Sequence, residues 1–115
     1  MTDSIFTKII KREIPADILH EDGHCVAIRD IHPQAKAHFL VIPKKQIARL
    51  AAAGDEDHTL LGHLLQTARR VAEKQGLSAD GYRVVINSGA NAGETVPHLH
   101  LHVLGGERLK DQFGA

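Results

Sequence analysis

Three histidines stand at alternate positions near the end of the chain, in the segment PHLHLHVLGG at residues 97–106. On a β-strand, side chains two residues apart share one face and lie roughly 6.6 Å apart. His98, His100 and His102 would therefore project together, with about 13 Å between the outer pair. The intervening apolar residues would point into the core: Leu99, Leu101 and Val103.

A metal site and a catalytic site are the two chemical uses of such a row. Three histidines binding one zinc ion must bring their ring nitrogens to about 2.0–2.1 Å from it, which a straight strand permits only under strain. We therefore expect no metal here, and one reactive imidazole flanked by two supporting ones. Neutral histidine is a nucleophile near neutral pH, and a hydrogen bond to its other nitrogen fixes the tautomer. His100, with a neighbour on either side, is the predicted nucleophile.

The loop before the triad indicates what is attacked. SGANAGETV, at residues 88–96, contains Gly89 and Gly93, which allow close approach of the backbone to a ligand. Its amides could line an anion site, although it lacks the Gly-Lys-Ser/Thr ending of a P-loop. Glycine-bearing loops are also common connectors, and histidines can simply fill a solvated strand face. Together, loop and triad predict phosphoryl or nucleotidyl transfer.

The remaining segments predict an α+β fold: an antiparallel sheet of about five strands, one long helix and a short N-terminal helix. The short helix covers about 4–12 behind a Ser4 N-cap, and the long one covers about 55–75 with apolar residues at helical spacing and Gly76 as its end. The expected strands are DILHE, CVAIRD, HFLVIP, YRVVIN and HLHLHVL, the first two forming a hairpin around Asp22-Gly23. A polar tail follows at 105–115.

Composition limits the class of protein. Fourteen basic residues balance fourteen acidic ones without long basic runs, which argues against a nucleic-acid binder. No apolar stretch is long enough for a membrane span, and the N-terminal residues lack the apolar run of a signal peptide. The single cysteine, Cys25, fits a reducing compartment. We expect one cytoplasmic domain over residues 1–115.

The segment HLHLHVL also matches the His-φ-His-φ-His-φ-φ signature (φ apolar) of the histidine triad (HIT) superfamily. Further blocks resemble its Hint branch, the purine nucleotide-binding phosphoramidases: SIFTKIIKREIPADILHED, DIHPQAKAHFLVIPKK, LLGHLL and GYRVVIN. The resemblance implies a HIT-like fold and a homodimer with the long helix and the YRVVIN strand at its interface. It implies no metal or other cofactor.

The resemblance also implies a mechanism. His100 would attack the α-phosphorus of a purine nucleoside 5′-phosphoramidate, such as adenosine 5′-phosphoramidate. The amine would leave, and water would hydrolyse the nucleotidyl-histidine to the nucleoside monophosphate. His98, His102 and His38 would form the polar network around the nucleophile.

The resemblance to the Hint branch also implies which residues contact the substrate. Asn87 and the segment from Gly93 to Thr95 would hold the phosphate, with the Thr95 hydroxyl near the leaving group. Asp30 would accept hydrogen bonds from the ribose. The purine would lie between four apolar residues, which could equally be plain core: Phe6, Ile9, Ile28 and Ile31.

Three positions depart from the Hint pattern. Glu94 stands where glutamine is frequent and could repel an anion or favour a protonated amine. Pro97 replaces an aromatic residue, and Gln46 replaces a histidine of some relatives, so a zinc site with Cys25 is unsupported and Cys25 is expected in the core. His58 and His63, on the long helix, are expected at the surface or in a cap.

Other functions remain open at this stage. Dinucleoside polyphosphate hydrolysis, as in the Fhit branch, is one alternative. A catalytically idle module that binds purine nucleotides is another, and a zinc protein is the third.

Overall fold

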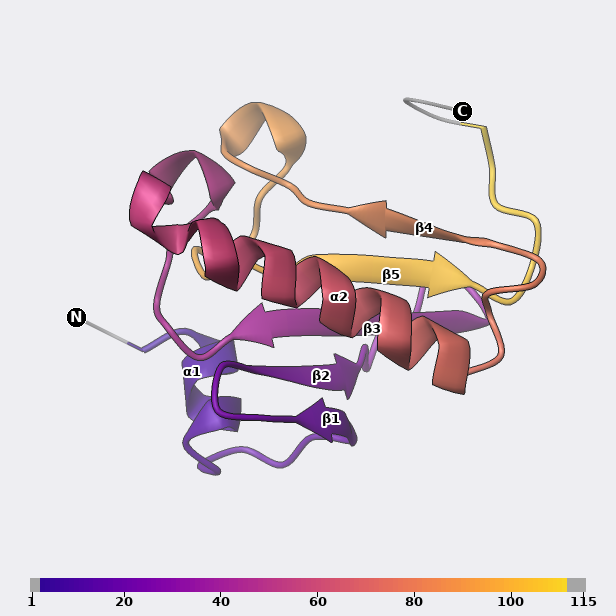
Figure 1. Cartoon of the computed structure of the whole chain (residues 1–115), viewed down its shortest axis with the longest axis horizontal. Helices are drawn as coiled ribbons and strands as arrows, with labels where there is room; N and C mark the ends of the chain where they lie inside the picture. The colour runs from indigo at the N-terminus through magenta and orange to yellow at the C-terminus, as the bar shows by residue number, and fades with distance from the viewer. Residues whose placement is uncertain (1–2, 112–115) are drawn as a thin grey trace.

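An antiparallel sheet of five strands, in the order β1-β2-β3-β5-β4, is the centre of the fold. The computed structural model describes residues 3–111, and its elements are shown in Figure 1. The strands are β1 (Ile18–Glu21), β2 (Cys25–Arg29), β3 (Ala37–Pro43), β4 (Tyr82–Val85) and β5 (Leu101–Gly105). The predicted α+β architecture is confirmed.

The short N-terminal helix α1 (Ile5–Ile10) begins as expected behind Ser4, whose hydroxyl accepts a hydrogen bond from the Thr7 amide. It is shorter than the predicted range of 4–12, because Arg12 already has a positive φ of 64°. The β1–β2 hairpin turns at Asp22-Gly23, as predicted.

The long helix α2 (His58–Lys74) follows a 3-10 turn, Asp55–Asp57, so together they match the expected range of 55–75. Gly76 has a φ of 76°, and the amides of Gly76 and Leu77 bond to the carbonyls of Glu73 and Ala72. This is the glycine-dependent helix end that the sequence predicts.

The two helices cover opposite faces of the sheet. In Figure 1, α2 runs lengthwise in front of the central part of the sheet, where it contacts β2, β3 and β5, while α1 packs at the end nearest the N-terminus. The larger core, beneath α2, contains Phe39, Val41, Leu64, Val71, Leu99, Leu101 and Val103 among others. The smaller one, beneath α1, contains Phe6, Ile9, Val26, Ile28, Leu40 and Ile42. The apolar residues between the triad histidines therefore point into the larger core, as predicted.

The last strand differs from its prediction. β5 begins at Leu101, not at His98, so only His102 of the triad lies within the ladder. Pro43, at the end of β3, has no N–H to donate, and its carbonyl is bonded by the His98 side chain. The Leu99 amide bonds instead to the Ile47 carbonyl. Strand β4 similarly ends at Val85, before the predicted Asn87.

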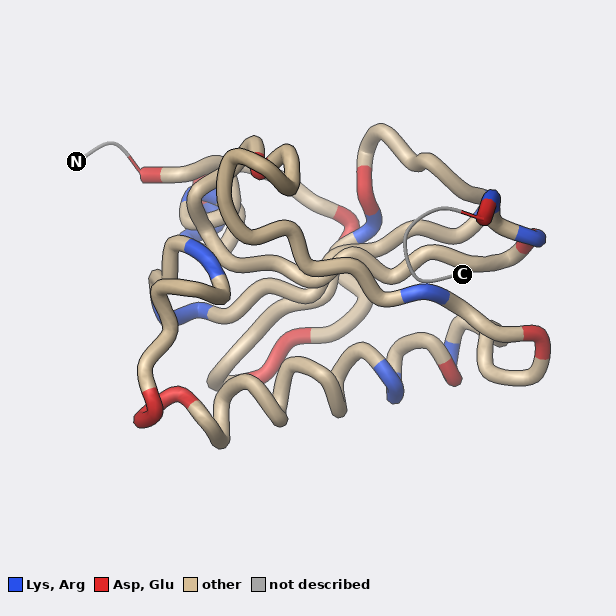
Figure 2. The backbone as a smooth tube through the Cα atoms, turned by 90° about the horizontal axis from the view of Figure 1, so that it is seen from above, with Lys and Arg blue, Asp and Glu red and all other residues tan. Residues whose placement is uncertain are grey.

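Acidic and basic residues alternate along much of the described chain. Figure 2 shows acidic and basic residues interspersed along the backbone. Within residues 3–111, no helix is both long and apolar enough to cross a membrane.

Candidate active site

His100 is held in one tautomer by the backbone of the triad itself. Its Nδ1 lies 2.7 Å from the carbonyl oxygen of His98. A carbonyl can only accept, so Nδ1 carries the proton and Nε2 keeps its lone pair. Among the described residues no group bonds to Nε2, and none of their buried polar side-chain atoms lacks a partner, so Nε2 is open to solvent. His100 therefore presents an available nucleophilic nitrogen.

His98 has the opposite tautomer and no free nitrogen. Its Nε2 donates to the Pro43 carbonyl at 2.9 Å, and its Nδ1 accepts from the hydroxyls of Ser4 and Thr7 at 3.1 and 3.2 Å. The ring is 2% exposed, and burial lowers its pKa, so it stays neutral. His98 thus joins α1, β3 and the chain before β5, and positions the carbonyl that orients His100.

His102 is oriented by a chain of hydrogen bonds. The Gln34 amide donates to Nδ1 of His38 at 3.1 Å, so the His38 proton is on Nε2. This Nε2 lies 2.9 Å from Nδ1 of His102, which must then accept and carry its own proton on Nε2. Asp30 Oδ2 lies 3.4 Å from the same His38 nitrogen. Burial lowers the pKa of His38 and lowers that of His102 to about 4.

The aromatic contacts bring these rings into one cluster. The His100 and His102 centroids are 5.0 Å apart, and Phe6 of α1 packs edge-on at 4.9 Å from His100. The structure therefore brings together the four histidines predicted to form the network. A neutral N–H donor, His102, stands beside a nucleophile, His100.

Glu94 is neutralised by an arginine that the sequence did not point to. Arg49 forms a two-pronged ion pair with it, with Nε–Oε1 and Nη2–Oε2 distances of 2.8 and 2.9 Å. Glu94 Oε1 also accepts from the Gly89 amide, which closes the loop at residues 89–94. Hydrogen bonding to Arg49 lowers the pKa of Glu94 to about 2. The isolated carboxylate considered from the sequence is thus one half of an ion pair.

The predicted substrate contacts differ in how far their side chains are exposed. Phe6, Ile9 and Ile28 are buried in the smaller core, whereas Ile31 is 77% exposed. Gly93 and Thr95 are exposed on the loop, Gly93 in the left-handed conformation with a φ of 77°. Asn87 is half-buried just beyond β4. Asp30 is half-buried, with Oδ1 accepting from the His32 amide at 2.8 Å.

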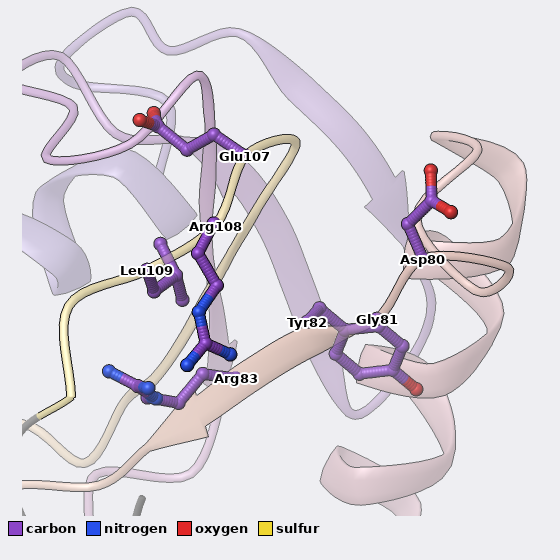
Figure 3. Close-up of a pocket in the computed structure, with 7 residues that line it drawn as sticks. All are labelled: Asp80, Gly81, Tyr82, Arg83, Glu107, Arg108 and Leu109. Atoms are coloured by element: carbon purple, nitrogen blue, oxygen red, sulfur yellow. The ribbon is translucent and has the colours of Figure 1, made fainter.

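A hollow beside the network is lined by residues of α1 and of the loop, including Ser4, Thr7, Thr95, Val96 and His98. Another hollow lies at the start of β4, where the side chains of Arg83 and Arg108 come together near Tyr82 (Figure 3). Its lining contains no histidine, cysteine or hydroxyl residue apart from Tyr82. The hollow at α1 and the loop adjoins the triad through His98 alone, and its lining does not include His100 or His102, so the candidate site is defined by the histidine network and not by a hollow.

Within the described part of the chain, two clusters offer metal-ligating atoms. One is Asp30, His38 and His102, and the other is His20, Asp22 and Cys25. In the first, the ligand nitrogens of both histidines are already engaged with each other. Cys25 is fully buried, as predicted, and burial raises the pKa of its thiol to about 11. His63, expected at the surface or in a cap, is half-buried and bonds to Asp22.

Comparison with known proteins shows the family of this chain. The HIT domain matches residues 11–109. The chain belongs to the HIT family. An uncharacterized HIT-like protein of Synechocystis is 58% identical to it over 104 residues, which are 90% of each chain.

Solved HIT structures are similarly close. A HIT family hydrolase from Legionella pneumophila has a TM-score of 0.91 at 44% identity, covering 94% of this chain and 96% of its own. One from Clostridium thermocellum has a TM-score of 0.93 at 41% identity, covering 97% of both chains. The HIT fold and the histidine triad are thereby established for this chain.

Sequence reasoning missed the partners that orient the HIT triad. Ser4 was expected as a helix cap, and it is one, but it also bonds to His98. Thr7 and Gln34 carried no signal beyond their polarity. Arg49 is separated from Glu94 by 45 residues, so its role depends on the fold.

The neutral histidines predict how stability depends on pH. His38, His98 and His102 have lowered pKa values in the folded state, whereas in the unfolded chain a histidine titrates near ~6.5. Between these values the unfolded state binds more protons, so the free energy of unfolding should fall as pH drops from about 6.5 towards about 4. Urea unfolding across this range measures the slope.

The variant His102→Gln should flatten this slope, and His58→Gln, an exposed site on α2, should leave it unchanged. Glu94 titrates below this window, because hydrogen bonding to Arg49 lowers its pKa to about 2. A free energy of unfolding that stays constant between about pH 6.5 and 4 would contradict the assignment of buried neutral rings.

Proposed function

We propose that this HIT protein is a cytoplasmic hydrolase of purine nucleoside 5′-phosphoramidates, acting through a nucleotidyl-His100 intermediate. The observation that carries the proposal is the bond from His100 Nδ1 to the His98 carbonyl, because it leaves Nε2 unprotonated and open. The relatives from Legionella and Clostridium are called HIT family hydrolases, which supports the general reaction class. The choice of a P–N bond rests on the resemblance to the Hint branch.

In the first step, Nε2 of His100 attacks the α-phosphorus while the P–N bond to the amine breaks. The ring becomes positively charged, and the Nδ1–H bond to the His98 carbonyl stabilises that charge at 2.7 Å. The amine takes a proton from solvent as it leaves, with the Thr95 hydroxyl as its hydrogen-bonding group. In the second step water attacks phosphorus and gives up a proton to solvent, the bond to His100 breaks, and the nucleoside monophosphate is released from the neutral ring.

His102 and the loop would stabilise the phosphate. Because His102 accepts at Nδ1 from His38, its Nε2–H is available to a phosphate oxygen in both steps. The pKa of about 4 keeps that ring a neutral donor throughout the physiological range. Asn87 and the amides from Gly93 to Thr95 would hold the remaining oxygens.

The nucleoside would lie towards Asp30 and Ile31. Ile31 is the exposed member of the predicted purine contacts, so it has apolar surface to bury, whereas Phe6, Ile9 and Ile28 contribute mainly by forming the floor. Asp30 would accept from the ribose hydroxyls with the oxygens that also face His38 and the His32 amide.

The idle binding module loses its main support. That alternative rested on Glu94 impairing turnover, but Arg49 balances the charge of this carboxylate and turns it towards Gly89. Dinucleoside polyphosphate hydrolysis uses the same nucleophile, and no contact in the structure favours it over the phosphoramidase. Activity on the two substrates distinguishes them.

A homodimer is the assembly we propose, with α2 and β4 at its interface. Leu65 on α2 is 52% exposed, although it belongs to the apolar series of that helix, and Val84 on β4 is 37% exposed. β4 is also an edge strand with one side unpaired in the single chain. A partner covering this face would bury both side chains.

Replacing the nucleophile should abolish turnover. With adenosine 5′-phosphoramidate as substrate and EDTA present, the wild type should release AMP, and His100→Ala should be slower by about 10³-fold or more. The exposed His58→Ala serves as the matched control and should keep full activity. AMP release is followed by chromatography, and AMP binding and circular dichroism show that His100→Ala is folded.

Wild-type protein that binds AMP tightly yet releases none from the phosphoramidate would overturn the proposal. Faster cleavage of diadenosine triphosphate than of the phosphoramidate would instead assign the polyphosphate reaction.

Disrupting the Arg49–Glu94 pair should weaken nucleotide binding. In Arg49→Met the Glu94 carboxylate loses its counter-charge beside the phosphate loop, and AMP affinity should fall roughly tenfold through repulsion. Adding Glu94→Gln removes that charge, so the double variant should recover most of the affinity. Isothermal titration with AMP measures both, and a double variant as weak as Arg49→Met would exclude the electrostatic explanation.

A further inference from the structure

A second cluster of reactive side chains lies where the β1–β2 hairpin meets α2, on the face of the sheet opposite the triad. It consists of His20, Asp22, Cys25 and His63. Cys25 is fully buried, while the side chains of the other three are about 27–31% exposed. The cluster is thus sheltered on one side and reachable from the other.

Asp22 is the centre of the cluster and is fixed by the backbone. Its Oδ1 accepts from the amides of His24 and Cys25, at 2.7 and 3.0 Å. Its Oδ2 faces three other groups: Nε2 of His20 and Nε2 of His63, both at 2.8 Å, and Sγ of Cys25 at 3.7 Å. One oxygen atom therefore has two imidazole nitrogens and one sulfur around it.

These spacings are close to those of a tetrahedral metal site. With bonds of about 2.0–2.3 Å, the ligand atoms around zinc lie about 3.3–3.7 Å from one another. The Sγ–Oδ2 distance of 3.7 Å already fits, and the distance of 2.8 Å from His20 Nε2 to Asp22 Oδ2 needs to open by about 0.5 Å. His20, Asp22 and Cys25 each place a ligand atom within 4.8 Å of the others.

We propose that this cluster binds one divalent transition-metal ion of the zinc class, through Nε2 of His20, Oδ2 of Asp22 and Sγ of Cys25, with His63 bonded to the Asp22 carboxylate as its supporting residue. One imidazole nitrogen, one carboxylate oxygen and one thiolate, completed by a solvent molecule, are ligands that zinc and cobalt accept in tetrahedral geometry. The carboxylate and the thiolate together balance the charge of the ion.

Besides this small opening, binding requires proton movements. The Cys25 thiol loses its proton to solvent as the metal–sulfur bond forms. The His20 imidazole transfers its proton from Nε2 to Nδ1, so that the Nε2 lone pair can coordinate, while His63 keeps its Nε2–H bond to Asp22. In the part of the chain that the structure describes, Nδ1 of His20 bonds to no protein group, so both of its tautomers are accessible.

The surroundings suit a structural ion. Thr67 Oγ1 lies 3.5 Å from Cys25 Sγ and 2.8 Å from the carbonyl of His63, one turn away on α2. The His24 ring packs against that of His63 with centroids 5.3 Å apart, beside an open hollow that gives the ion a route in. The bound metal, with His63 on Asp22, would tie the hairpin to α2, away from the reacting groups of the triad.

Cobalt titration of the full chain, stripped with EDTA, tests the site directly. Because Cys25 is the single cysteine, a thiolate-to-cobalt charge-transfer band can come only from this residue. We expect the band to saturate at one Co²⁺ per chain and to disappear when Zn²⁺ is added. Cys25→Ser should lack it, and His63→Gln should weaken Co²⁺ binding by at least about tenfold.

The matched control is His58→Gln, which makes the same replacement at an exposed position of the same helix and should bind Co²⁺ as the wild type does. If Cys25→Ser does not fold, His20→Gln replaces it and should weaken binding as His63→Gln does. A folded wild type without the band, or a band unaffected by His63→Gln and His20→Gln, would overturn the proposal. His100→Ala should keep the band, so this result is independent of the phosphoramidase test.

Discussion

The hydrogen bond from His100 Nδ1 to the carbonyl of His98 is the constraint on which the proposed chemistry depends. It decides which nitrogen of His100 is nucleophilic, and it can stabilise the charge that the ring acquires on attack. The carbonyl itself is held in place because the His98 side chain is bonded on both sides, to Pro43 and to the two hydroxyls of α1. The alternating histidines thus have unequal tasks: His98 positions, His100 reacts and His102 donates.

Burial and hydrogen bonding support this division in different ways. Removal from water keeps His98 and His102 neutral, and their partners then choose the tautomer of each ring. A charged ring at either position would carry a proton on Nδ1 as well and could no longer accept the hydrogen bond that orients it. The short helix α1 matters for this reason, since it supplies Ser4, Thr7 and the Phe6 ring that cover the triad.

Local sequence signals were enough to predict the sheet, the hairpin at Asp22, the helix end at Gly76 and the face on which the histidines lie. Each depends on periodicity or on a residue with a special backbone preference. The predicted start of β5 at His98 was wrong. Pro43, at the end of the neighbouring strand β3, has no N–H with which to continue the ladder. Long-range pairs had no such signal: Arg49 with Glu94, and His63 with Asp22, meet only because the fold brings them together.

The tautomers of the triad are the most direct test of this account. Two-bond nitrogen–proton NMR correlations on histidine-labelled protein distinguish a protonated from an unprotonated ring nitrogen, and His100→Gln identifies the signals of His100. We predict that His100 carries its proton on Nδ1, whereas His98 and His102 carry theirs on Nε2. A His100 ring protonated on Nε2 in the free protein would contradict the account, because the nitrogen assigned to the attack would then have no lone pair available.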